Sequence, residues 1–100
     1  MIHVVAIITA KPGKRAEILD AFHANMPAVH AEAGCIEYGP AIDAEGLGQA
    51  TFGPDAFVVI EKWESPEALA AHAKSAHMVA YAAKTKGLVA NRSIYVLKAA

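Results

Sequence analysis

His72 is the side chain in this sequence best suited to proton chemistry. It follows Leu69 by three residues, on the inward stripe of a predicted helix. Histidine is the side chain whose ordinary charge change falls near neutral pH, so an imidazole that faces an apolar pocket can serve as a base. The alternative is a hydrogen-bonded core or rim histidine with no part in catalysis. His72 is therefore the candidate catalytic residue, and both interpretations stay open at this point.

Trp63 and Glu61 are two residues apart on a predicted strand, so their side chains share one face. Trp63 has enough flat apolar area to form a wall of an aromatic-binding pocket, and core packing explains it equally well. Glu61 needs a partner, because an unpaired carboxylate on an apolar face is costly. Arg92 and His72 are candidate partners, and a structural ion pair explains Glu61 better than catalysis does. Both Trp63 and Glu61 join the candidate substrate-binding residues.

Three tyrosines, Tyr38, Tyr81 and Tyr95, could each direct a phenol at a pocket, although Tyr is also an ordinary packing residue. His77 follows His72 by five residues, which on a continuous helix puts the two imidazoles about 140° apart. We therefore expect no metal between them. The sequence also contains neither a zinc-protease motif nor a cluster of cysteines, so we predict no metal site.

Charge and composition exclude several classes of function. The formal net charge is −1 and no basic run extends beyond Lys14-Arg15, which argues against a nucleic-acid partner. The single cysteine, Cys35, excludes an intramolecular disulfide and fits a cytoplasmic location. No segment approaches the ~20 apolar residues of a membrane span. The absence of a nucleotide-binding glycine loop and a P-loop removes phosphate transfer and the common flavin or nicotinamide sites.

Hydrophobic periodicity predicts the elements that position these residues. Met1–Ala10 is apolar on both alternating faces and is expected to be a strand. An apolar stripe at three- and four-residue steps predicts a helix that ends at Gly34, and its members are Ile18, Leu19, Phe22, Met26 and Val29. Further strands are expected at Cys35–Tyr38, which Gly39-Pro40 stops, at Phe57–Glu64 and at Arg92–Lys98, with a long loop over Pro40–Ala56. Ser65-Pro66-Glu67 begins the second helical region, which continues as His77–Lys86.

The predicted order is β-α-β-β-α-β in one domain over residues 1–100. This is the α+β, ferredoxin-like arrangement, with a four-stranded antiparallel sheet and helices on one face. Since the first and third strands are apolar on both sides, the bare face should be covered by the same face of a second copy. We therefore expect a homodimer.

Three segments carry a resemblance to a known family. They are Lys11-Pro12-Gly13, Glu32-Ala33-Gly34-Cys35 and above all the run EKWESPEALAAHAKSAHMVAY from Glu61 to Tyr81. In these segments the chain resembles the antibiotic biosynthesis monooxygenase family, most closely its bacterial quinol monooxygenase branch. The resemblance implies a dimeric α/β barrel with a pocket in each subunit. It also implies oxidation of a small quinol or phenol with O₂ as co-substrate and without metal or flavin, because a deprotonated quinol can itself donate an electron to oxygen.

The same resemblance assigns roles to individual residues. It implies His72 as the base or orienting group, Trp63 and Tyr81 as pocket walls, and His77 at the pocket mouth. Two branches of the family match less well. The polyketide-tailoring oxygenases have an asparagine where this chain has Val59, and the haem-ligating histidine of the haem-degrading relatives falls near Ala82.

Two other functions remain possible on such a scaffold. One is isomerisation of a small carbonyl compound, in which a histidine shuttles protons. The other is a non-catalytic dimeric binding or stress-response protein whose pocket holds an apolar metabolite. Fold alone does not decide among these functions.

Overall fold

The computed structural model describes residues 1–100 and contains four strands and three helices. In chain order they are β1 (Ile2–Ala10), α1 (Arg15–His30), β2 (Cys35–Ala41), β3 (Ala56–Trp63), α2 (Pro66–Lys74), α3 (Ala76–Thr85) and β4 (Val89–Leu97). The predicted β-α-β-β-α-β order is confirmed, with the second helical region divided into two helices. None of the three helices has the length and the apolar composition that a membrane crossing requires.

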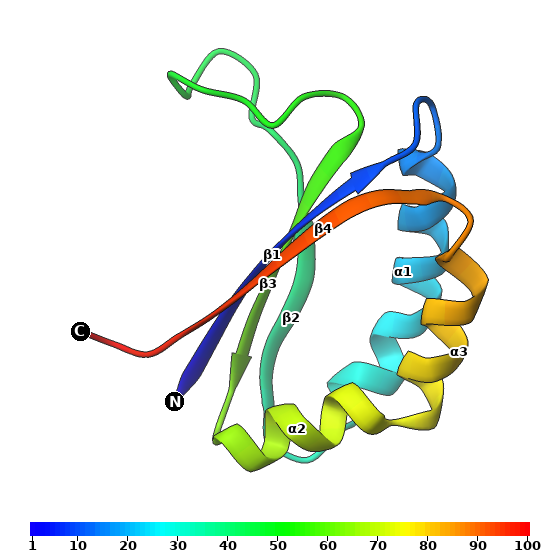
Figure 1. Ribbon diagram of the computed structural model, residues 1–100. Helices are drawn as coiled ribbons and strands as arrows, with labels where there is room; N and C mark the ends of the chain where they lie inside the picture. The colour runs from blue at the N-terminus through cyan, green and yellow to red at the C-terminus, as the bar shows by residue number, and fades with distance from the viewer.

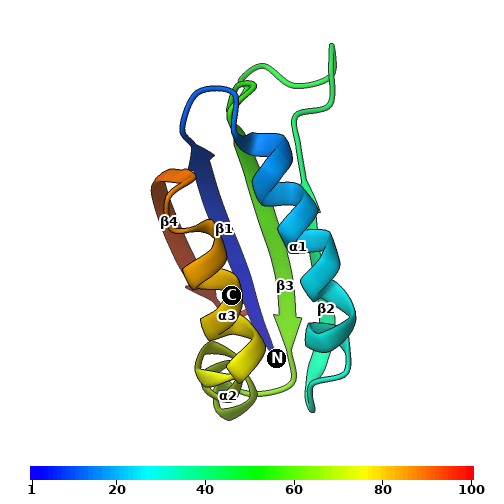
Figure 2. The same cartoon turned by 90° about the vertical axis from the view of Figure 1, so that its right-hand side faces the viewer.

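The four strands form one sheet in the order β2-β3-β1-β4, and every neighbouring pair is antiparallel. This is the ferredoxin-like topology predicted from the sequence. All three helices cover the same face of the sheet, as Figure 1 shows from the side. Seen from the helix layer, α1 lies beside the pair α2 and α3 (Figure 2). The opposite face of the sheet carries no second layer within the chain.

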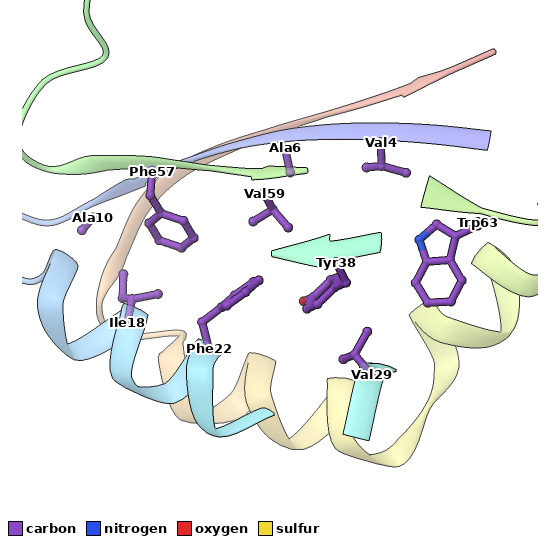
Figure 3. Packing of buried hydrophobic residues seen from close by; sticks show 10 residues of the cluster. All are labelled: Val4, Ala6, Ala10, Ile18, Phe22, Val29, Tyr38, Phe57, Val59 and Trp63. Atoms are coloured by element: carbon purple, nitrogen blue, oxygen red, sulfur yellow. The ribbon is translucent and has the colours of Figure 1, made fainter. Parts of the chain in front are cut away.

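The core lies between the sheet and the helices (Figure 3). The stripe predicted for the first helix is confirmed, because Ile18, Phe22 and Val29 are buried and the other members pack against them. The Phe22 ring stacks on Tyr38 with centroids 5.0 Å apart. Each such buried apolar side chain stabilises the fold by roughly 1.5–3 kcal/mol, so this layer holds α1 firmly against β2 and β3.

Two strand boundaries differ from the prediction by more than one residue. Strand β2 does not stop at Gly39-Pro40 but continues to Ala41, where it pairs with Val58. Proline is tolerated there because β2 is an edge strand, so its missing N–H group removes no bond between central strands. Strand β4 begins at Val89, three residues earlier than expected, because Val89 already pairs with Ala10 of β1.

Ser75 interrupts the second helical region between His72 and His77. Its backbone is extended, with φ −63° and ψ 149°, and its hydroxyl accepts a hydrogen bond from the backbone N–H of Met78 at 3.4 Å. Ser75 thus ends α2 and caps α3 at once. The 140° separation expected for a continuous helix does not apply, because the chain turns between the two histidines.

Candidate active site

Glu32 joins His72 and His77 into one cluster of side chains. Its Oε2 atom lies 2.8 Å from Nδ1 of His72 and 2.8 Å from Nε2 of His77. A carboxylate can only accept hydrogen bonds, so both ring nitrogens donate to it. The change of direction at Ser75 makes this convergence possible. We refer to Glu32, His72 and His77 as the Glu32 cluster.

Gly34 brings the Glu32 cluster together. Glu32 follows the end of α1. Gly34, two residues later, has φ +85°, a left-handed backbone conformation that residues other than glycine rarely adopt. A Cβ atom at position 34 would lie 2.6 Å from the Cβ atom of Ala68, so only glycine lets this loop touch α2. The carbonyl of Gly34 also accepts a hydrogen bond from the backbone N–H of Glu64 at 2.9 Å. The loop is thereby fixed against the helix that carries His72.

The other nitrogen of His72, Nε2, has no hydrogen-bond partner among the residues of the chain. It forms no hydrogen bond within the chain, yet the structure has no fully buried side-chain nitrogen or oxygen without a partner. Nε2 must therefore border open space, although His72 as a whole is only 4% exposed. In a neutral ring whose proton is on Nδ1, Nε2 carries the lone pair. His72 also lines a cavity, and a ring in this tautomer has its proton acceptor on Nε2.

That cavity has a volume of about 550 Å³ and lies between the helices α2 and α3 and the strands β1, β3 and β4. Its size is in the usual range for a small-molecule site. The walls are mainly apolar, with Glu61, His72 and Arg92 as the exceptions, and the complete lining is Val4, Glu61, Leu69, His72, Ala73, Met78, Val79, Ala82, Arg92, Ile94 and Val96. A second cavity of about 470 Å³ shares Met78, Ala82 and Arg92 with it and is lined by Tyr81.

Glu61 finds its partner in Trp63. The indole Nε1 donates a hydrogen bond to Oε1 of Glu61 at 2.9 Å, and no ion pair involves Glu61. The predicted ion pair with Arg92 or His72 is therefore wrong, because the tryptophan N–H two residues along the strand satisfies the carboxylate. Burial raises the pKa of Glu61, whereas the bond from Trp63 and the nearby His72 act to lower it.

Trp63 and Tyr38 hold the ring of His72 in place. Trp63 is fully buried and its ring centroid lies 4.6 Å from that of His72, while Tyr38 meets the same imidazole edge-on at 5.4 Å. Neither residue is among those that line the cavity. Burial also raises the pKa of Tyr38 above its ordinary value, so its phenol stays neutral. These two aromatic side chains position the imidazole from behind.

The remaining predicted residues do not line the cavity that His72 borders. Tyr81 lines the second cavity, and burial raises its pKa to about 12 while Arg92 opposes that shift. Tyr95 is exposed on the face of the sheet that the helices leave bare. His77 contacts Glu32 outside the cavity. Sequence reasoning missed Glu32 as a site residue, and its one signal was the Glu32-Ala33-Gly34-Cys35 run.

Residues 1–84 match the family described as "Antibiotic biosynthesis monooxygenase". The chain belongs to this family. It is 40% identical to the Escherichia coli K12 protein "Probable quinol monooxygenase YgiN", over 98% of this chain and 97% of that relative, and to the Shigella flexneri protein of the same name over the same shares. The recognition made from the sequence motifs is confirmed.

Solved structures show the same fold. The Pseudomonas aeruginosa protein PA3566 has a TM-score of 0.84 and 26% identity, covering 99% of this chain and 93% of its own. The Mycobacterium tuberculosis protein Rv0793 has a TM-score of 0.82 and 25% identity, covering 99% of this chain and 94% of its own. The architecture of this chain is thus shared by proteins that are only about one quarter identical to it in sequence.

Proposed function

We propose that this family member oxidises a small quinol or phenol with O₂ and that His72 is the base. The observation that carries the proposal is the His72 ring, whose Nδ1 is hydrogen-bonded to Glu32, whose Nε2 has no partner within the chain, and which lines a mainly apolar cavity. The relatives named quinol monooxygenase support this substrate class.

The proposed reaction begins with proton transfer from a ring hydroxyl to Nε2 of His72. Glu32 then stabilises the imidazolium, because its carboxylate already contacts Nδ1–H at 2.8 Å. The resulting quinolate is rich in electrons and donates one to O₂, which gives a semiquinone radical and superoxide. Neither a metal nor a flavin is therefore needed for this first electron transfer. The protein supplies the base, the orientation and a mainly apolar cavity.

The cavity walls suit a flat aromatic ring. Leu69, Met78 and Val79 offer apolar surface on the helix side. Glu61, whose raised pKa follows from burial, provides a polar atom that can bind a second ring hydroxyl. Arg92 lies at the junction of the two cavities, and Tyr81 borders the second one. We assign these residues to substrate binding, with Trp63 and Tyr38 as positioning residues for His72.

The proposal includes a homodimer formed through the bare face of the sheet. Val5 of β1 pairs with Ile60 of β3 and with Tyr95 of β4, and all three side chains point away from the helices. Ile60 and Tyr95 are 40% and 52% exposed, and Val58 and Ile7 pair next to them. Apolar surface of this kind is usually covered by a partner. Such a dimer would form the α/β barrel typical of the family.

The proposal also includes a cytoplasmic location, which the free thiol of Cys35 suits.

Sedimentation tests the dimer. The wild-type chain should sediment as a dimer at micromolar concentration, and Ile60→Glu should shift it to a monomer. Val79→Glu is the matched control, since Val79 is 61% exposed but belongs to α3 on the helix side. A monomeric wild type would contradict the dimer, as would a dimer unaffected by Ile60→Glu.

Oxygen uptake tests the reaction. Chelator-treated protein is mixed with a panel of hydroquinones and naphthoquinols, and O₂ consumption is recorded for the wild type, His72→Ala and His23→Ala. His23 is an exposed histidine of α1 outside the cavity and serves as the control. We expect uptake with the wild type and the control, and its loss in His72→Ala. No uptake with any quinol, or equal uptake by His72→Ala, would refute the proposal. Product formed without oxygen would indicate an isomerase, and binding without product would indicate a non-catalytic binding protein.

A further inference from the structure

We propose that the Glu32 cluster binds one Zn²⁺ ion or a similar divalent transition metal, and that the bound metal inactivates His72 as a base. The binding site stands on the geometry of the cluster alone. The inactivation rests on the proposed function.

The donor atoms of the Glu32 cluster converge on one point. Oε2 of Glu32, Nδ1 of His72 and Nε2 of His77 all lie within 4.8 Å of one another, and both O–N distances are 2.8 Å. Ligands at about 2.0–2.1 Å from zinc in a tetrahedral site are roughly 3.3 Å apart. Each O–N pair must therefore open by about 0.5 Å, and the two nitrogens, which are at most 4.8 Å apart, must close to that spacing through movement of the partly exposed His77 ring. Two imidazoles and one carboxylate are also a donor set that zinc accepts, with water at the fourth position.

Each imidazole can free the nitrogen that would bind the metal without any change in the charge of the ring. Each ring donates a hydrogen bond to Glu32 from the nitrogen that would face the metal. A neutral imidazole frees that nitrogen by moving its proton to the other one, which is Nε2 in His72 and Nδ1 in His77. The hydrogen bonds to Glu32 are thereby exchanged for bonds to the metal.

The cluster is held rigidly and is open to solvent on one side. The side chains of His72 and Glu32 are 6% and 14% exposed, and that of His77 is 28% exposed. Trp63 fixes the His72 ring from behind, with centroids 4.6 Å apart. Preorganised ligands reduce the entropy that binding would otherwise cost. A hydrated ion can approach past His77.

A metal in this position would lie outside the substrate cavity. His72 lines the cavity, but Glu32 and His77 do not. The ion would therefore contact the Nδ1 side of His72 and leave the reacting substrate untouched. Since a neutral imidazole that binds metal through Nδ1 carries its proton on Nε2, the lone pair at the cavity edge is lost. Metal binding thus converts His72 from a proton acceptor into a proton donor.

Calorimetric titration of metal-free protein with ZnCl₂ tests the binding site. We expect one zinc per chain, at least tenfold weaker binding in His77→Ala, and unchanged binding in His23→Ala. His77 is partly exposed, so its truncation should leave the fold intact, which circular dichroism checks. Equal zinc affinity in the wild type and His77→Ala would overturn the site, as would no saturable binding to the wild type.

Nitrogen-detected NMR of the histidine rings tests the site without any variant. In metal-free protein the His72 proton should be on Nδ1, and stoichiometric zinc should move it to Nε2. A ring that keeps its proton on Nδ1 with zinc present would overturn the proposal.

Oxygen uptake separates this proposal from the proposed function. If quinol oxidation occurs, stoichiometric zinc should reduce the wild-type rate more than tenfold and a chelator should restore it. His77→Ala, compared with its own metal-free rate, should be far less sensitive. Uninhibited oxidation by zinc-loaded protein would overturn the inactivation. A protein that binds zinc as described but oxidises no quinol would refute the proposed function and leave the metal site standing.

Discussion

Replacing Glu32 by glutamine removes the charge that orients His72 while it preserves shape. The amide oxygen of the substituted side chain can still accept the Nδ1–H of His72, and partly exposed His77 can adopt its other tautomer beside the amide nitrogen. The fold should therefore survive the exchange. What is lost is the carboxylate that stabilises the imidazolium formed when His72 takes a proton.

The magnitude of this effect follows from the 2.8 Å bond between Glu32 and Nδ1 of His72. A hydrogen bond to a charged partner stabilises by about 1.5–3 kcal/mol and a neutral one by about 0.5–1.5 kcal/mol. The exchange thus costs about 1–2 kcal/mol. Because about 1.4 kcal/mol corresponds to a tenfold change in rate, kcat should fall roughly 5- to 30-fold. KM should change little, since Glu32 does not line the cavity.

Steady-state O₂ uptake with a quinol substrate measures both constants. Glu64→Gln is the control, because Glu64 is an exposed carboxylate near the same loop and contacts neither histidine. The control should retain wild-type kcat and KM. A Glu32→Gln variant whose kcat stays within twofold of the wild type would refute the orienting role of Glu32. A rise in KM at constant kcat would also contradict it, since that would indicate a role in binding.

Two further predictions concern stability. Gly34→Ala should lower the free energy of unfolding by about 2–4 kcal/mol, because it combines a left-handed backbone with a 2.6 Å approach to Ala68, whereas Gly13→Ala, with φ +77° and open space around it, should lose only about 1 kcal/mol. Denaturant titration distinguishes them, and equal losses would argue against the close contact. Glu61→Gln should raise the Tm at pH 7, since burial raises the pKa of Glu61 and folding therefore disfavours its charged form, while Trp63 can still donate to the amide oxygen. The increase in Tm caused by Glu61→Gln should become smaller as the pH falls toward the unfolded-state pKa near 4.5, because Glu61 of the wild type then becomes protonated in both the folded and the unfolded state. An increase in Tm that persists at low pH would contradict this cause.

The fold could be predicted because hydrophobic periodicity reports which faces are covered. The alternation in β1 and the stripe on α1 follow directly from burial against the sheet and helix layers. The end of β2 could not be predicted from Gly39-Pro40, because only the sheet order shows that β2 is an edge strand that tolerates proline.

The site could be predicted only in part. His72 can be recognised because one helix carries both it and the inward stripe, and Glu61 and Trp63 because a strand places alternate residues on one face. Glu32 lies 40 residues before His72 in the chain, and its contact depends on a glycine turn and on the break at Ser75. Local patterns do not report such long-range contacts, so the sequence does not identify the residue that holds the His72 ring at Nδ1.

Anaerobic absorption spectroscopy tests most directly whether Nε2 of His72 takes a proton from a phenolic hydroxyl. A quinol or phenol with a distinct phenolate band is mixed with metal-free protein in the absence of O₂, where proton transfer can occur but oxidation cannot. The bound ring should show the phenolate band at a pH at which the free compound is neutral, and His72→Gln should abolish that band while the compound still binds. A bound ring that stays neutral in the wild type, or that ionises equally in His72→Gln, would contradict the account.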